Sequence, residues 1–348
     1  MEHSIFAPSA GMGGNLARTH VAVIGAGLAG LSCASALQEA GFEVSVFDKG
    51  RGPGGRMSTR RGAGWQGDHG AQYFTARDLR FCAEAARWEQ AGVAARWNTQ
   101  VVAVDADGAV SACTPTERFV GMPGMTAPAA WLAGSLTLHT DMLISTLRRD
   151  RAGWRLHVQG GEPLALHYDA VVLALPAPQA QALLRDVAPL QAALAGAAKM
   201  ESCWAMMLQF GAPLALGFEA AFVNRGPLRW VARDSSKPGR AGSESWILHA
   251  SAEWSDAHLE LDADSIAAHL LPAFAALGAP APERWSAHRW RYAKAAQVRN
   301  EECIWVNAQS LGLCGDWLGG GTVEAAWLSG LALAQRITAS QPASRLGA

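Results

Sequence analysis

The stretch V-A-V-I-G-A-G-L-A-G at residues 21–30 decides the fold of this chain. Its first four apolar residues predict a short buried parallel strand, and the G-x-G-x-x-G run predicts a tight turn into a helix. We expect Gly25 to make the turn, Gly27 to let the backbone approach a pyrophosphate, and Gly30 to let the helix pack against the strand. The start of that helix then offers unpaired N–H groups to phosphates.

A glycine turn of this kind is a weak signal alone, but the residues after it strengthen it. Residues 28–39 carry small and apolar side chains at helical spacing. Asp48 ends a second predicted strand, where its carboxylate can hydrogen-bond ribose hydroxyls. The run R-G-P-G-G-R at 51–56 follows, and its Arg56 is expected to contact a phosphate through a bidentate guanidinium. This order of signals predicts a bound dinucleotide, FAD.

A second turn-to-helix junction lies near the other end of the chain, where L-C-G-D at 313–316 ends a strand and G-G-G at 319–321 opens a helix. Asp316 is expected to accept hydrogen bonds from ribityl hydroxyls or to lie against the pyrophosphate. The start of the second helix would stabilise negative charge on reduced flavin. The predicted cofactor-binding residues are Gly25, Gly27, Leu28, Ala29, Gly30, Asp48, Lys49, Arg51, Gly55, Arg56, Met57, Ile144, Gly315, Asp316, Val323 and Glu324.

Composition narrows the class of protein. A chain of 348 residues, half of them apolar and 17% charged, predicts a compact protein of two structural units. The net charge of −1 predicts no nucleic-acid or anionic-membrane partner. No apolar run reaches the ~18 residues that span a bilayer, and residues 1–18 lack the features of a secretory signal, so we expect a cytoplasmic protein. No two cysteines are spaced as C-x-x-C, and no metal site is predicted.

The expected fold class is α/β (α+β overall), with a discontinuous Rossmann-like FAD-binding domain and a smaller antiparallel-sheet substrate domain. Helices are expected at 78–90 and 265–277, and parallel-sheet strand character at 170–175. Further strands are expected at 140–147, 153–158, 203–210 and 245–250. The predicted limits are a flexible leader at 1–18, the FAD-binding domain at 19–77, 125–185 and 291–338, the substrate domain at 78–124 and 186–290, and a tail at 339–348.

Four segments give the sequence a family resemblance. They are R-G-P-G-G-R-M-S-T-R at 51–60, D-H-G-A-Q-Y-F at 68–74, V-G-M-P-G-M at 120–125 and G-D-W-L-G-G-G at 315–321. Together they resemble the bacterial renalase-like flavoproteins, within the wider group that includes amine oxidases and phytoene-desaturase-like enzymes. The resemblance runs over roughly residues 20–338. The second and fourth segments are the more particular to the renalase branch.

This resemblance implies a fold of the p-hydroxybenzoate-hydroxylase type with non-covalent FAD. It also implies oxidation of isomeric NAD(P)H, which carries its extra hydride at C2 or C6 of the nicotinamide, to NAD(P)⁺. The hydride goes to flavin N5, and O₂ or another acceptor reoxidises the flavin. Either dihydronicotinamide isomer remains open as the preferred substrate.

Hydride transfer needs no protein acid or base, but it needs the donor carbon held roughly 3 to 3.5 Å from its acceptor. We therefore expect a shaped pocket rather than a catalytic triad. By position, Tyr73 and Phe74 should lie along the flavin, His249 could hydrogen-bond a carboxamide, and Trp290 could form an aromatic wall. Asn224 and Arg233 are weaker candidates, and His69 is expected to order its loop.

Other functions remain open on the sequence. A flavin amine oxidase of the same wider group is the main alternative, in which a lysine is often bridged by water to N5; Lys237 or Lys294 could take that place. A flavin-holding protein without turnover would be yellow but would accept electrons from no small donor. A plain NAD-binding dehydrogenase would purify colourless.

Overall fold

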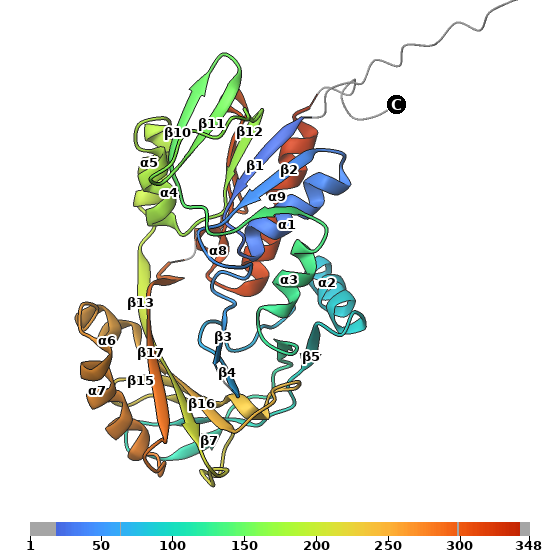
Figure 1. Cartoon of the computed structure of the whole chain (residues 1–348). Coiled ribbons are helices and arrows are strands. Elements are labelled where there is room, and N and C mark those ends of the chain that lie inside the picture. Colours follow the sequence, from blue (N-terminus) through green and yellow to red (C-terminus); the bar gives the residue numbers. More distant parts are fainter. Residues whose placement is uncertain (1–18, 63, 298, 342–348) are drawn as a thin grey trace, which may run out of the picture.

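The computed structural model describes residues 19–62, 64–297 and 299–341. Figure 1 shows two lobes, one above the other, joined by several passages of the chain. The predicted leader at 1–18 and residues 342–348 of the predicted tail lie outside the described residues.

The upper lobe is built on a six-stranded sheet in the order β18-β19-β12-β1-β2-β9. All neighbours are parallel except β18 and β19, which pair antiparallel. The strands are β1 (His20–Ile24), β2 (Glu43–Phe47), β9 (Thr137–His139), β12 (Ala170–Leu173), β18 (Ile304–Val306) and β19 (Leu311–Leu313). The Rossmann-like sheet predicted from residues 21–30 is therefore confirmed, and distant segments assemble it.

Both faces of this sheet are covered, which explains why β1 is apolar at every buried position. Val21 and Val23 belong to the core that contains helices α1 (Leu28–Glu39) and α9 (Val323–Ala339). Ala22 and Ile24 face the opposite core, which contains the hairpin of β10 (Ile144–Asp150) and β11 (Gly153–Val158). Successive side chains of a strand point to opposite faces, so a strand buried on both needs no polar alternation.

The lower lobe contains a seven-stranded sheet in the order β17-β13-β16-β15-β14-β6-β7. Helices α6 (Ala252–Ala257) and α7 (Ala263–Ala275) cover its outer face (Figure 1). Its other face looks toward the upper lobe. The strands are β6 (Val101–Val104), β7 (Val110–Ala112), β13 (Met200–Phe210), β14 (Ala220–Val223), β15 (Leu228–Arg233), β16 (Glu244–Ala250) and β17 (Arg284–Ala295).

Shorter elements connect the two sheets. The hairpin of β3 and β4 descends from the upper lobe onto the lower sheet, where Gly67 lies so close that a Cβ there would stand 3.1 Å from Cγ of Met207. The remaining elements are β3 (Thr59–Gly62), β4 (Trp65–Asp68), α2 (Leu79–Gln90), β5 (Ala94–Arg96), β8 (Phe119–Gly121), α3 (Ala127–Ala133), α4 (Ala177–Leu184), α5 (Pro189–Gly196), the 3₁₀ turns Asp234–Ser236 and Asn307–Gln309, and α8 (Asp316–Gly319).

The strand predicted at 140–147 is wrong in its start. Asp141 has a left-handed φ of 55°, and its N–H donates to the carbonyl of Gly50, while that of Met142 donates to Asp48. This segment is tied to the chain after β2, so a strand forms only from Ile144. The strand predicted at 153–158 matches β11.

We retain the division into two domains as a proposal. The limit predicted at 290/291 falls inside β17, which pairs with β13 along most of its length. The whole of β17 therefore belongs with the lower sheet in the division that we propose.

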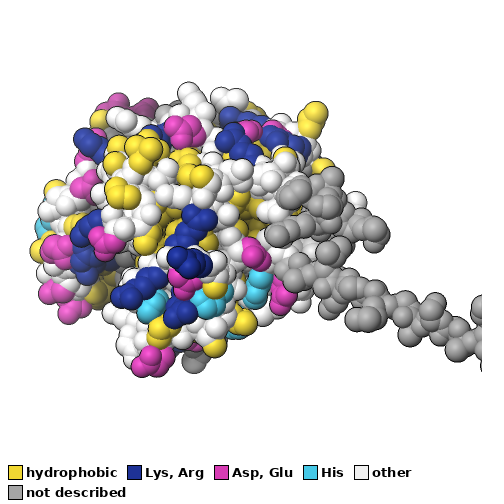
Figure 2. Space-filling model, turned by 90° about the horizontal axis from the view of Figure 1, so that it is seen from above, with side chains coloured by type: hydrophobic (Ala, Val, Ile, Leu, Met, Phe, Trp, Pro, Cys, Tyr) yellow, Lys and Arg dark blue, Asp and Glu magenta, His cyan; other side chains and the backbone are white. Residues whose placement is uncertain are grey.

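The exposed charges are mixed in sign on the face seen in Figure 2. Basic side chains there lie beside acidic ones, with apolar groups between them. Of the described helices, none is both long and apolar enough to cross a membrane.

Candidate cofactor and substrate site

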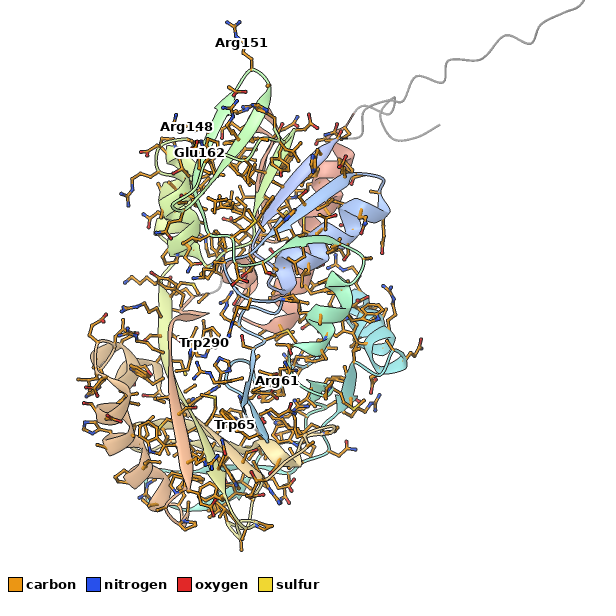
Figure 3. The ribbon with its side chains drawn as sticks, viewed as in Figure 1. Arg61, Trp65, Arg148, Arg151, Glu162 and Trp290 are labelled. Atoms are coloured by element: carbon orange, nitrogen blue, oxygen red, sulfur yellow. The ribbon has the colours of Figure 1, made fainter. Side chains whose placement is uncertain are left out.

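A cavity of about 2480 Å³ lies between the lobes and is lined from both sheets. Figure 3 shows Trp290 of the lower lobe and Arg61 of β3 in the region where the two lobes face each other. A pocket for one small ligand usually measures roughly 300 to 1,000 Å³. The cavity is therefore large enough for a dinucleotide cofactor and a second ligand.

The three glycines before and within α1 have different structural roles. Gly25 has φ +110°, and a Cβ there would lie 2.5 Å from the carbonyl oxygen of Ala174. A Cβ at Gly30 would lie 1.9 Å from the carbonyl oxygen of Gly25, so this glycine allows the helix to approach the turn. A Cβ at Gly27 would meet nothing within 4 Å. Gly27 thus borders open space, as a backbone that approaches a ligand must.

The start of α1 is suited to an anion. Gly27 is its N-cap, and the part of the chain that the structure describes forms no side-chain cap there. The first N–H groups of a helix have no partner within the helix, and its dipole favours negative charge there. Gly27, Leu28 and Ala29 all line the cavity. These features fit the pyrophosphate of FAD.

Asp48 lines the cavity at the end of β2, as predicted, and it also holds the glycine turn. Its Oδ2 accepts from the N–H of Ala26 at 2.6 Å, and its Oδ1 accepts from the N–H of Gly50 at 2.6 Å. Each carboxylate oxygen can accept a second hydrogen bond. The same group can therefore order the turn and receive a ribose hydroxyl.

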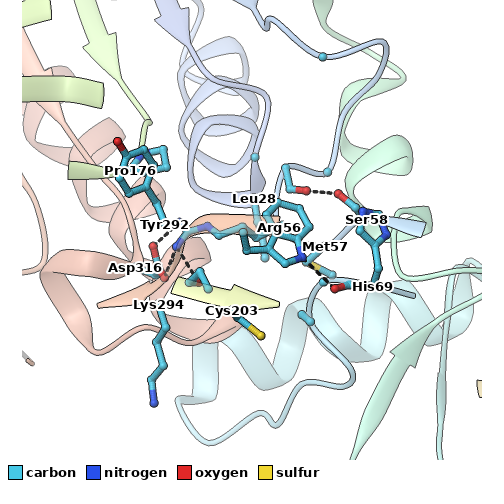
Figure 4. Close-up of a pocket in the computed structure, with 18 of the residues that line it drawn as sticks. Leu28, Arg56, Met57, Ser58, His69, Pro176, Cys203, Tyr292, Lys294 and Asp316 are labelled. Atoms are coloured by element: carbon cyan, nitrogen blue, oxygen red, sulfur yellow. Dashed lines mark hydrogen bonds and ion pairs between the residues drawn. The ribbon is translucent and has the colours of Figure 1, made fainter. Parts of the chain in front are cut away.

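Arg56 and Asp316 bring the two predicted motifs together, although 260 positions separate them in the sequence. The guanidinium donates to both carboxylate oxygens, at 3.0 and 2.5 Å, and to the carbonyl of Ala293 at 3.3 Å (Figure 4). Paired donation of this kind fixes the geometry of both side chains. The structure thus places both residues at one point of the cavity wall.

Most predicted cofactor-binding residues line the cavity: Gly25, Gly27, Leu28, Ala29, Asp48, Lys49, Arg51, Gly55, Arg56, Met57, Ile144, Gly315, Asp316 and Val323. Gly30 does not, because its function is in packing. Glu324 does not either. Its Oε1 accepts from the N–H groups of Arg77 and Asp78, each at 2.7 Å, so it anchors the start of α2.

The lower sheet presents a row of side chains to the cavity. The strand registers set Trp230 beside His249, His249 beside Ala205, and Ala205 beside His288, across β15, β16, β13 and β17. Trp290 follows His288 by two positions and so shares its face. Trp230, His249, His288 and Trp290 line the cavity. The predicted positions of His249 and Trp290 in the pocket agree with this geometry.

His69, from the loop after β4, completes an aromatic wall. Its ring stacks on Trp290 with centroids 5.3 Å apart and meets His288 edge-on at 4.7 Å. Its carbonyl oxygen accepts from Nε1 of Trp290 at 2.9 Å and lies 3.2 Å from Nε2 of His249. The loop-ordering role expected for His69 is only part of its place here, because its ring also lines the cavity. We call His69, His288 and Trp290 the aromatic wall.

His69, His249 and His288 are neutral at pH 7. Burial, with His288 and Arg60 nearby, lowers the pKa of His69 to about 3. Burial lowers the pKa of His249 to about 4, and burial together with Arg60 lowers that of His288 to about 4. The wall therefore presents uncharged rings to a ligand.

The neutral state of His249 predicts a pH-dependent stability. Its folded-state pKa of about 4 lies below the ordinary 6.5, so the unfolded chain takes up the proton first as the pH falls. The stability that neutral His249 contributes is complete above the ordinary pKa. It is lost as the pH falls toward the folded-state pKa. We expect the free energy of unfolding to drop by about 2 kcal/mol from this group between about pH 7.5 and pH 5.

Urea unfolding of wild type and His249→Asn at both pH values measures this drop. The variant retains a donor for the carbonyl of His69 but has no titrating ring, so its loss over the same interval should be smaller by that amount. Equal losses in the two proteins would contradict the burial of a neutral His249.

Tyr73 and Phe74 do not lie in the cavity, which corrects the prediction made for them. Phe74 is 3% exposed, and its backbone pairs with Phe119. This pairing directs its ring into an aromatic core with Phe81 and Trp88. Tyr73 packs against Trp230, behind the lining. Phe74 therefore packs in the core, and Tyr73 packs against a residue that lines the cavity without lining it itself.

The two lysines considered for an amine oxidase differ sharply in position. Lys237 is fully buried, 2.7 Å from Oδ1 of Asp234 and 3.3 Å from Oδ2 of Asp68, and does not line the cavity. Lys294 is exposed and does line it. Only Lys294 therefore remains as a candidate for that role.

The weaker candidates also separate. Asn224 lines the cavity, and its side-chain oxygen accepts from Arg229 at 2.9 Å. Arg233 instead donates to Glu244 at 2.9 Å and is not part of the lining. Arg233 thus has a structural ion pair in the lower lobe.

Two family models match the chain. A model described as NAD(P)-binding Rossmann-like domain matches residues 23–85, and one described as flavin containing amine oxidoreductase matches residues 109–338. The second match covers the hairpin β10–β11, the lower sheet from β13 onward and the second nucleotide motif. Together they include both segments that meet at Arg56 and Asp316.

Solved structures share the fold at low sequence identity. A putative protoporphyrinogen oxidase from Exiguobacterium sp. 255-15 superposes with a TM-score of 0.78 at 14% identity, over 94% of this chain and 100% of that one. A triple mutant of putrescine oxidase gives 0.76 at 14%, over 93% and 99%. Cyclohexylamine oxidase from Brevibacterium oxydans IH-35A gives 0.72 at 13%, over 93% and 99%.

Proposed function

The chain belongs to the family of flavin containing amine oxidoreductases, and on that premise we propose that it oxidises the 2- or 6-dihydro isomers of NAD(P)H to NAD(P)⁺. The family confirms the predicted flavin oxidoreductase and its FAD cofactor. The choice of a dihydronicotinamide donor is our proposal, supported by the substrate side of the cavity.

The residues present fit FAD. The open backbone at Gly27 and the uncapped start of α1 would hold the pyrophosphate, Asp48 the adenosine ribose, and Arg56 with Asp316 the middle of the cofactor. Non-covalent binding is part of the proposal. When bound, FAD supplies the acceptor for a hydride.

The aromatic wall is the observation that carries the proposed donor. The flat rings of His69 and Trp290 stack on each other at an interplanar angle of 23°, and both residues line the cavity. A dihydronicotinamide ring is flat and uncharged and can stack on such groups. His249, through the ring nitrogen not directed at His69, would bind the carboxamide. These side chains orient the donor and exclude water, and none of them needs to move a proton.

Charge near the wall also favours a dinucleotide. Arg289 and Arg291 pair with Glu260, but the cavity residues from β3 and the lower lobe still carry more positive than negative charge: Arg60, Arg61, Arg225, Arg229 and Lys294 against Glu201 and Glu253. Such a lining attracts the phosphates of a dinucleotide and disfavours a protonated amine.

Amine oxidation is the second candidate function, and Lys294 is the observation that favours it. This lysine lines the cavity on β17 and borders Gly321 of the second nucleotide motif. Its position resembles that expected of a lysine that orders water near the flavin. The aromatic wall alone does not exclude a neutral amine.

Anaerobic mixing of the FAD-loaded protein with each donor class tests the proposal. We expect the visible band of oxidised flavin to bleach with the 2- or 6-dihydro isomer at least about 100-fold faster than with primary amines, since correct orientation contributes far more than this to a rate. Bleaching by an amine and none by either isomer would reverse the assignment. A yellow protein that no donor bleaches would indicate a flavin-holding protein without turnover.

Reoxidation is measured in the same cell. Admitting O₂ and then a quinone to the bleached protein compares the two acceptors, and formation of hydrogen peroxide identifies the first. Ordinary 4-dihydro NADH is the matched control donor, since it has the same charges and ring but holds its hydride at a different carbon.

A further inference from the structure

Arg60 carries a positive charge that pairs with no carboxylate among the described residues. It lies in β3 and lines the cavity, with Nη2 3.4 Å from Nδ1 of His288. Among residues 19–62, 64–297 and 299–341 it forms no ion pair, whereas Arg56 pairs with Asp316, and Arg289 with Glu260. An arginine in a cleft without a carboxylate is suited to a ligand anion.

The position of Arg60 is separate from the start of the cofactor site. Arg56 reaches β17 at the carbonyl of Ala293, and Arg60 reaches the same strand at His288. These contacts are five positions apart, roughly 17 Å at the rise of a strand. The two arginines therefore contact positions of β17 that lie well apart.

His69 provides a second, independent sign of a ligand at this point. It is 6% exposed, and its Nδ1 is buried without a hydrogen-bond partner among the described residues. Leaving such an atom unpaired costs about 1 to 3 kcal/mol. The ring meets His288, the contact of Arg60, edge-on at 4.7 Å. Arg60 and His69 both contact His288, and all three residues line the cavity, so an anion bound to the guanidinium would lie beside this imidazole.

We propose that Arg60, with His69 and His288, forms a subsite for a phosphate group of the substrate, distinct from the site of the cofactor's pyrophosphate. The guanidinium would donate two N–H groups to phosphate oxygens, and a neutral imidazole would donate a third. This subsite rests on the proposed function, because it assigns the phosphate to a dinucleotide donor. It makes Arg60 a residue that selects phosphate-bearing substrates.

Two other arginines, Arg61 and Arg148, differ from Arg60 in position. Side chains alternate along a strand, so Arg61 points away from Arg60, and its guanidinium lies 3.5 Å from Oγ1 of Thr126. Arg148 lies on β10 at the far end of the upper lobe, away from Trp290 and the cavity (Figure 3). Arg148→Gln therefore removes the same charge without touching the site.

Calorimetric titration of the FAD-loaded, oxidised protein with inorganic pyrophosphate measures the subsite without any turnover. We expect Arg60→Gln to weaken pyrophosphate binding by about 10- to 100-fold, the range for a hydrogen bond to a charged group. Arg60→Lys should weaken pyrophosphate binding less, because lysine keeps the positive charge but lacks the paired N–H donors of the guanidinium. Arg148→Gln should bind as wild type does. Equal binding by wild type and Arg60→Gln would overturn the subsite.

Kinetics then identify what Arg60 holds. With the dihydro isomer of NAD(P)H, Arg60→Gln should raise KM by a similar factor and change kcat little. With a phosphate-free N-alkyl dihydronicotinamide of the same isomer type, wild type and Arg60→Gln should react alike. An equal loss with both donors would mean that Arg60 acts on the cofactor, and the proposal would be wrong.

The two proposals fail in different ways. If neither isomer bleaches the flavin but pyrophosphate binding still depends on Arg60, the substrate assignment is wrong and the anion subsite stands. If an isomer bleaches the flavin equally well in Arg60→Gln, with unchanged KM, the function stands and the subsite is wrong.

Discussion

Replacing Lys237 by methionine is expected to lower the free energy of unfolding by about 3 to 5 kcal/mol, the cost of breaking a buried ion pair from one side. Lys237 is 2% exposed and donates to Asp234 at 2.7 Å, to Asp68 at 3.3 Å and to Oε1 of Gln72 at 3.3 Å. Arg240 is the second cation and donates to Asp68. Without Lys237, two buried carboxylates share one cation.

The two carboxylates respond differently to this environment. Burial opposes ionisation of Asp68, but Lys237 and Arg240 outweigh it and hold its pKa at about 2. Burial and the charge of Asp68 raise the pKa of Asp234. The network is therefore sensitive to the loss of either cation, and the variant should take up a proton at a higher pH than wild type, because losing Lys237 raises the pKa of these carboxyls.

This network also positions the aromatic wall. Oδ1 of Asp68 accepts from Thr59 at 2.6 Å and from the N–H of Met125 at 3.1 Å, and its carbonyl accepts from Gln72. His69 is the next residue. If Asp68 loses its contacts, the carbonyl of His69, which accepts from Nε1 of Trp290, should therefore be displaced.

Urea unfolding followed by circular dichroism measures the effect. Lys294→Met, on the exposed part of β17, is the matched control and should lie within about 0.5 kcal/mol of wild type. Adding Asp234→Asn to Lys237→Met should recover part of the loss, because it removes the uncompensated charge. A Lys237→Met protein as stable as the control would show that the network is not a closed set of buried charges.

Gly30→Ala is expected to destabilise the apoprotein by about 1 to 3 kcal/mol and to abolish tight FAD binding, since one added methyl overpacks a close contact. A Cβ at Gly30 would lie 1.9 Å from the carbonyl oxygen of Gly25 and 3.0 Å from Cβ of Ala174. The nearest atom is backbone, so the helix must move away from the turn. That movement displaces the N–H groups that face the cavity.

Gly27→Ala is the matched control, because the same methyl there meets no protein atom within 4 Å. We expect the stability of the apoprotein to change by less than about 0.5 kcal/mol. FAD binding should nevertheless weaken, because the methyl occupies the side from which a pyrophosphate approaches. Thermal unfolding of the apoproteins and fluorescence titration with FAD separate the two effects. Equal apoprotein stability in the two variants would contradict the packing role of Gly30.

The cofactor half of the site could be predicted closely from the sequence. Gly25, Gly27 and Gly30 occupy a turn whose conformation depends on residues within a few positions of one another. Asp48 and Arg56 follow in fixed order along the same segment. Such local constraints survive in any fold that contains the motif.

The substrate half could not be predicted in this way. Tyr73 and Phe74 have the residue types of a flavin pocket, but the pairing of Phe74 with Phe119 directs its ring into the core. His69 offered no local signal for the aromatic wall, whose partner Trp290 is 221 positions away. The start of β10 depended likewise on contacts with the segment after β2.

The sequence by itself determined the strand–turn–helix that receives a pyrophosphate, because glycine spacing and hydrophobic period act over a few residues and set backbone conformation locally. Only the tertiary structure decided which side chains face the second ligand. Strand register aligned His249 with His288, and the descent of β3 and β4 onto the lower sheet brought Arg60 and His69 to them. Strand register and the position of the β3–β4 hairpin depend on packing between distant segments. The side chains that face the second ligand are therefore set only when the whole chain has folded.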